Sequence, residues 1–198
     1  MRKTVPATRL DATRRRAQIL NTAMPVFARF GFAGTSTRQI AAAASIAEPI
    51  LYRHFRNKAA LFRAVLDLVA RRLEHAIGAV IASAAGARAR LLALAAALPG
   101  LLAAHEDELR VLCGAAASHT DTAQTRATRA ALTRLGTVLT KGLGGPGLRR
   151  GVDRATAAYF LLEVGLGSAL LRPVGVRAVS RRGYGERALA LLTHALLP

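Results

Sequence analysis

Positions 35–58 gather side chains that can bind a polyanion. Thr35, Ser36 and Thr37 supply consecutive hydroxyls. At the start of a helix, such hydroxyls and the backbone amides bind a phosphate oxygen well. Arg38 follows, exposed by the phase of the neighbouring apolar residues, and it can reach a phosphate or a base edge. Lys58 adds a charge for another phosphate. Together these residues predict a surface that contacts a nucleic-acid backbone.

Each of these side chains also has an ordinary structural role, and the sequence leaves that alternative open. Ser36 or Thr35 can cap a short helix, because a hydroxyl accepts a proton from an unpaired amide of the first turn. Arg38 and Lys58 can simply be solvated, as charged residues on helices usually are.

Catalytic and metal-binding constellations are not evident in the sequence. The single cysteine, Cys113, excludes an intramolecular disulfide and a cysteine-rich zinc site. Residues 105–108 read His-Glu-Asp-Glu, but adjacent residues of a helix point in different directions and do not converge on a metal. No orienting third residue or oxyanion loop accompanies Cys113. We therefore expect no enzymatic activity, no cofactor and no metal, in a reducing compartment such as the cytoplasm.

The charge of the chain favours an anionic partner. Lys and Arg number 29 against 11 Asp and Glu, which gives a formal net charge of +18. Residues 1–72 hold 14 cations and 3 acids, a net of +11, whereas residues 73–198 hold 15 and 8, a net of +7. Nucleic acid is the first candidate partner, and an anionic membrane surface is the second. A chain that is basic throughout remains the plain alternative.

Helical periodicity accounts for the segments that must position residues 35–58. Apolar residues recur at three- and four-residue steps from position 13, and Gly31 is expected to end that helix. Pro25 should kink it, and Pro49 fits the first turn of a later helix. The predicted segments are a flexible basic arm at 1–12, helices over 13–30, 36–44 and 48–55, a turn at 45–46 and a linker helix over about 58–84.

The remainder of the chain also reads as helical, and no strand alternation is found. The longest apolar stretches, 91–104 and 155–171, are interrupted by Pro99-Gly100 or carry Glu163 and two glycines. A bilayer crossing needs about 20 mostly apolar residues, so both stretches are expected to be buried helices rather than membrane spans. The predicted helices of this part cover 87–98, 101–118, 122–143, 153–171 and 184–197.

The pattern of residues 19–62 is more specific than its periodicity. It reads Ile-Leu…Ala…Phe…Gly-Phe-Ala-Gly-Thr-Ser…Ile-Ala…Ala…Ile…Leu-Tyr-Arg-His-Phe…Asn-Lys…Leu-Phe and closely resembles the N-terminal domain of TetR-family repressors. The resemblance implies an all-α fold: an N-terminal three-helix helix-turn-helix domain at 13–58, followed by a helical ligand-binding and dimerisation bundle at 59–198. It places the recognition helix near 47–55, where it would enter the major groove.

The expected recognition helix departs from the commoner family pattern. Many relatives carry Ser, Lys, Gly and Thr at positions 47–50, where this chain has Ala, Glu, Pro and Ile. Glu48 can accept a bond from a cytosine amino group or only favour the helix N-terminus, and Ile50 can pack on a thymine methyl group. In the resembling proteins the positions of Tyr52 and His54 touch phosphates. The predicted DNA contacts are therefore Thr35, Ser36, Thr37, Arg38, Glu48, Pro49, Ile50, Tyr52, Arg53, His54 and Lys58.

For the body, the resemblance implies a ligand pocket and a homodimer formed through about 153–171 and 184–197. Polar groups in otherwise apolar helices are the candidate ligand contacts, although each is more often a structural residue: His105, Cys113, His119, Tyr159 and Glu163. The surrounding Ala, Leu and Val favour a hydrophobic ligand. The expected function is a ligand-responsive repressor that binds a near-palindromic operator on double-stranded DNA, and a basic protein of the membrane surface is the alternative.

Overall fold

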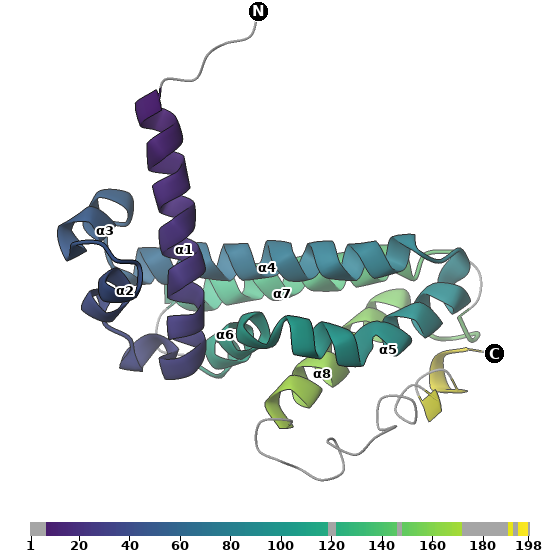
Figure 1. The fold of residues 1–198 in the computed structure, drawn as a ribbon. Coiled ribbons are helices and arrows are strands. Elements are labelled where there is room, and N and C mark those ends of the chain that lie inside the picture. The colour runs from purple at the N-terminus through teal and green to yellow at the C-terminus, as the bar shows by residue number, and fades with distance from the viewer. Residues whose placement is uncertain (1–6, 119–121, 146–147, 172–189, 192–193, 198) are drawn as a thin grey trace, which may run out of the picture.

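The computed structural model describes residues 7–118, 122–145, 148–171, 190–191 and 194–197. Throughout these ranges the regular structure is helical, which confirms the predicted all-α class (Figure 1). The helices are α1 (Ala7–Gly34), α2 (Thr37–Ala43), α3 (Glu48–His54), α4 (Lys58–Ala82), α5 (Gly86–Ala104), α6 (Glu106–Ala117), α7 (Thr122–Gly142) and α8 (Arg154–Leu171).

Helix α1 begins earlier than the sequence predicted. It is helical from Ala7, so the expected flexible arm is wrong for residues 7–12, and residues 1–6 lie outside the described part of the chain. The described side chains at this end, from Asp11 to Arg14, are exposed. They show no apolar period because they cover no core, although Ala, Arg and Leu are strong helix formers. The backbone leaves helical geometry at Gly31 (φ 68°, ψ 177°), as expected of a helix-ending glycine.

The front helices and the body share one hydrophobic core. Phe27 of α1 packs edge-on against Phe62 of α4, with their ring centroids 4.8 Å apart. The same cluster continues without a gap through Leu51 of α3, Leu112 of α6 and Leu135 of α7. The sequence suggested a separate body behind a small head, but α4 and α6 carry apolar side chains that belong to both.

Helices α5 and α8 are the most apolar helices among the described residues. Helix α5 runs through the exposed Pro99 and Gly100, where two shorter helices were predicted. The mean hydropathy of an 18-residue window is 1.5 in α5 and 1.2 in α8, so both are long and apolar enough to cross a membrane by composition alone. Core helices of soluble proteins have the same composition. Both helices pack against other helices of the bundle (Figure 1).

Candidate nucleic-acid interface

Helix α2 begins with a complete capping box. The backbone amide of Gln39 donates to Ser36 Oγ at 3.2 Å, and the amide of Ser36 donates to Gln39 Oε1 at 2.7 Å. Each side chain thus satisfies an amide that the first turn leaves unpaired. Thr35 is only 2% exposed, and its hydroxyl donates to the carbonyl of Gly31 at 2.7 Å. The cap is therefore Ser36, and the predicted phosphate contact through the Thr35 hydroxyl is corrected to a structural bond.

A side-chain network joins α2 to α3. The hydroxyl of Thr37 donates to Glu48 Oε1 at 2.5 Å, and the same oxygen lies 3.1 Å from the phenol oxygen of Tyr52. Because the Thr37 proton goes to the carboxylate, the Tyr52 phenol donates to Thr37. Glu48 therefore acts as an internal anchor one turn before Tyr52. The expectation that its carboxylate reads a cytosine gives way to this positioning role.

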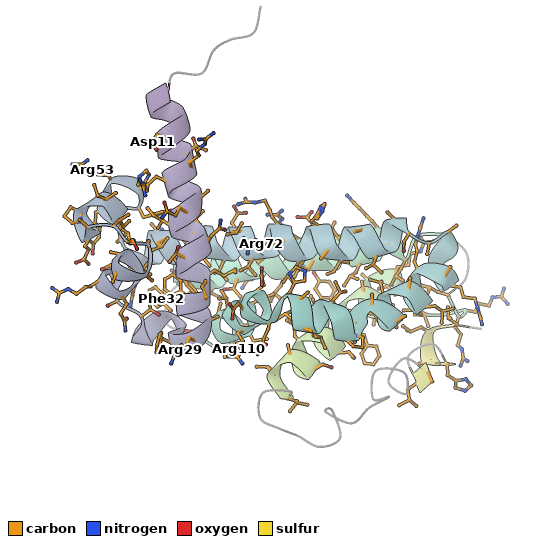
Figure 2. All side chains as sticks on the ribbon, viewed as in Figure 1. Asp11, Arg29, Phe32, Arg53, Arg72 and Arg110 are labelled. Atoms are coloured by element: carbon orange, nitrogen blue, oxygen red, sulfur yellow. The ribbon has the colours of Figure 1, made fainter. Side chains whose placement is uncertain are left out.

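The outward face of α3 carries the remaining predicted contacts. Leu51 is fully buried and fixes the helix on the core. Pro49, Tyr52 and Arg53 are exposed, and Tyr52 is 47% accessible. In Figure 2, Arg53 lies at the outer edge of the molecule. Ile50 and His54 are half-buried beside these three residues.

Lys58, predicted to bind a phosphate, instead closes the loop between α1 and α2. Its ammonium donates to the carbonyls of Phe32 and Thr35, both at 2.8 Å, and stands 4.5 Å from the centre of the Phe32 ring. These bonds satisfy two carbonyls where α1 ends and the chain turns. Lys58 thus fixes the end of α1 and its connection to α2 against the start of α4.

Helix α1 contributes to this face in a way that the sequence did not indicate. Gln18 Nε2 donates to the carbonyl of Ala44 at 3.1 Å, at the end of α2, and Arg15 donates to Gln18 Oε1 at 2.8 Å. The guanidinium of Arg16 lies over the Phe55 ring, 4.9 Å from its centre. The arginine run at positions 14–16 was the available signal, but its relation to α3 depends on contacts 26 or more residues apart in sequence.

The cations of this face have no acidic partner among the described residues. The arginine–carboxylate pairs of the described residues lie elsewhere, within or between α4, α6 and α7. Arg134 with Asp67 at 2.9 Å is an example. Arg14, Arg38 and Arg53 are exposed and take part in none of these pairs. Unpaired exposed cations beside a short, well-anchored helix form a surface suited to a phosphate backbone.

Comparison with known proteins agrees with this geometry. Residues 19–65 match the family described as bacterial regulatory proteins, tetR family. Residues 19–65 therefore carry the N-terminal domain of this family. The matched residues run from the buried Ile19 of α1 through the helix-turn-helix to Val65 of α4.

Solved structures extend the likeness in fold over nearly the whole chain. A TetR-family regulator from Cytophaga hutchinsonii has a TM-score of 0.73 and 21% identity, covering 98% of this chain and 96% of its own. E. coli NemR in its reduced form gives 0.74 at 19% identity, covering 92% and 97%. AibR, solved with isovaleryl coenzyme A and operator DNA, gives 0.69 at 22% identity, covering 93% and 99%. At these identities the likeness establishes the fold.

The predicted ligand contacts do not converge in the described structure. His105 lies at the junction of α5 and α6, where its Nδ1 is 3.8 Å from Glu108. Tyr159 is 41% exposed on α8, and Glu163 is also exposed. His119 lies outside the described residues. The described candidates thus lie on different helices and face different surroundings, and their role as ligand contacts stays a prediction.

Cys113 is a buried structural residue. It is 7% exposed, and its thiol lies 3.9 Å from the carbonyl of Leu166 on α8. Burial raises the pKa of the Cys113 thiol, because the charged thiolate is poorly solvated there. A thiol of this kind is mostly protonated near neutral pH and is a poor nucleophile.

Proposed function

We propose that this chain is a cytoplasmic transcriptional repressor that binds a near-palindromic operator as a homodimer and leaves it when a small molecule binds to its body. The observation that carries the proposal is the outward face of α3. Tyr52 is held there through Thr37, and Arg53 projects from the surface without an acidic partner among the described residues. The structure of AibR with operator DNA and isovaleryl coenzyme A supports both activities by likeness of fold.

The proposed dimer uses the exposed apolar face of α8. Tyr159, Phe160, Leu170 and Leu171 are 41%, 44%, 56% and 44% exposed. An apolar patch of this kind is typical of an interaction surface. The second predicted dimer helix, 184–197, lies largely outside the described residues. Two paired chains would set their recognition helices about one DNA turn, ~34 Å, apart. Replacing Phe160 with Arg should yield monomers in sedimentation velocity, and an unchanged dimer would place the interface elsewhere.

The DNA-binding proposal is tested by gel shift at several salt concentrations, with duplexes from the promoter region beside the chain's own gene. A repressor of this kind should retard one duplex selectively and bind it less tightly as salt rises, because released counterions drive the association. Anionic vesicles are tested in parallel, since a basic chain with two apolar helices can also bind a membrane surface. Equal retardation of every duplex, or binding to vesicles alone, would refute the proposal.

Single variants distinguish residues that contact phosphates from residues that determine sequence preference. Arg53→Ala should weaken binding and reduce the slope of log K against log salt by about 0.9, the value for one lost phosphate contact. Arg126→Ala is the matched control, because Arg126 is an exposed arginine on α7. Tyr52→Phe should weaken binding to all sequences with an unchanged slope, since the phenol is neutral. Pro49→Ser should change sequence preference.

A further inference from the structure

The body contains a cavity of about 100 Å³ that is partly open to the surface, and its walls come from every long helix behind the helix-turn-helix. Leu73 of α4, Leu98 of α5, Leu109 of α6, Leu135 of α7 and Gly165 of α8 each contribute to its lining. None of the lining side chains within the described residues carries a charge or a hydrogen-bonding group. The sequence pointed to His105, Cys113, Tyr159 and Glu163 instead, and none of these lines it.

We infer that this cavity is the effector site and that its ligand is a compact, uncharged, predominantly hydrocarbon molecule. The inference rests on the proposed function and specifies the ligand class. A charged or strongly polar molecule would lose its hydration here without gaining a partner. A dry apolar cavity of about 150 Å³ binds benzene or xenon in other proteins, so a cavity of this order suits ligands of that size.

The cavity wall is linked through side chains to α1, which packs against α2 of the helix-turn-helix. Leu109 lines it, and the next residue along the chain toward the N-terminus is Glu108, whose carboxylate accepts a bond from Arg72 at 2.9 Å. Arg72 also donates to Asn21 Oδ1 of α1 at 2.8 Å. A ligand that moves α6 outward therefore pulls on the contact that holds α1 against α4. Such a ligand favours the DNA-free arrangement only if it binds that arrangement more tightly.

A glycine in the cavity wall allows a filling variant with a matched control. At Gly165 an added Cβ would find its nearest neighbour, Leu98 Cδ1, at 3.9 Å, so a larger side chain has room to enter the cavity. Gly167 lies on the same helix, outside the lining, and an added Cβ meets nothing within 4 Å. Both Gly165→Leu and Gly167→Leu raise helix propensity equally. Only the first should occupy the cavity.

Binding is measured without DNA, by thermal unfolding with benzene and with benzoate, which has the same ring and a negative charge. Benzene at ten times its Kd should raise the unfolding midpoint of the wild type and of Gly167→Leu by about 3 °C. It should leave Gly165→Leu unchanged, and benzoate should shift none of them. A wild-type midpoint that benzene leaves unchanged, or an equal shift by benzoate, would overturn the assigned ligand class.

The effector role is measured by fluorescence anisotropy on the duplex selected in the gel shift. Benzene should weaken DNA binding by the wild type about fivefold or more and should not affect Gly165→Leu. Benzene that binds the cavity yet leaves DNA affinity unchanged would overturn the effector role. A chain that binds no duplex even without benzene would refute the proposed function instead, while the unfolding measurements would still decide the ligand class.

Discussion

Several residues with charged or polar groups act inside the helix-turn-helix rather than on its surface. Thr35 and Lys58 satisfy carbonyls at the end of α1 and in its connection to α2, and Glu48 anchors Thr37. The exposed groups left for DNA on α3 are then the Tyr52 phenol, the Arg53 guanidinium and the apolar Pro49, with Ile50 and His54 half-buried beside them. This helix therefore offers few hydrogen bonds for base recognition, and we expect sequence-dependent DNA shape to contribute more to specificity.

Lys58→Met tests this assignment at a single residue. The variant keeps the aliphatic stem but removes the donor from the carbonyls of Phe32 and Thr35. We expect the free energy of unfolding to fall by about 1–3 kcal/mol in chemical denaturation, because the carbonyls lose their partner. The slope of DNA affinity against salt should stay unchanged, in contrast to Arg53→Ala. A reduced slope with unchanged stability would return Lys58 to the phosphate contacts.

The starts of two helices show which features of the helices can be predicted from local sequence and which cannot. Ser36 at the start of α2 was predicted as a possible cap, because the capping rule is local in sequence. The early start of α1 was missed, since its first residues cover no core and so leave no apolar period. The contacts of Lys58 and Gln18 were also missed, because their partners lie 23 to 26 residues away and follow only from the packed fold. The cavity likewise depends on five helices meeting.

Breaking the capping box of α2 should destabilise the element that supports α3. Ser36→Ala removes the acceptor for the Gln39 amide and should cost about 1 kcal/mol, or about 2–4 °C in the unfolding midpoint. Gln39→Ala removes the reciprocal bond. Because both substitutions dismantle the same box, the double variant should lose less than the sum of the single losses. Strict additivity in this cycle would show that the two bonds act independently.

The start of α8 should make stability depend on acid pH. Asp153 Oδ2 accepts bonds from the amide and the hydroxyl of Thr156 at 2.8 and 3.0 Å. The amide bond above all holds the pKa of the Asp153 carboxyl below its usual value. The charged form therefore stabilises the fold above the unfolded pKa of about 3.9, and this contribution is lost as pH falls through the folded value.

Asp153→Asn keeps a capping oxygen but does not titrate. The unfolding midpoint of the wild type should exceed that of the variant at pH 6, and the difference should shrink as pH falls below about 4. Asp11→Asn, an exposed carboxylate on α1, controls for the loss of a surface charge. A difference that stays constant from pH 6 to pH 3 would contradict the assigned role of Asp153.

At the scale of the molecule, one arginine ties three helices together. Arg72, labelled on α4 in Figure 2, donates to Asn21 of α1 and to the buried Glu108 of α6. The neighbouring Arg71 pairs with Asp67 on the surface of the same helix, where both side chains are 51% exposed. These adjacent arginines allow a direct comparison of a bridging cation with a solvated one.

Arg72→Met should be far more disruptive than Arg71→Met. It leaves the Glu108 carboxylate buried without its cation, which we expect to cost about 1–3 kcal/mol, a value reduced because Arg72 is itself partly solvated. Arg71→Met should change stability by less than about 1 kcal/mol. Chemical denaturation of both variants measures the difference, and equal losses would argue against Arg72 as a structural bridge.

The shared core has a consequence for how such a protein can diversify. Since Phe27, Leu51 and Leu112 belong to one cluster, α6 supplies part of the wall against which the helix-turn-helix folds. Cutting the chain at residue 58 would separate the helix-turn-helix from the body. The apolar side of α1 on one fragment and that of α4 on the other would then be exposed to water. Exchanging operator specificity between relatives therefore requires grafting only the outward side chains of α3. The helices beneath α3 must stay with the body against which they pack.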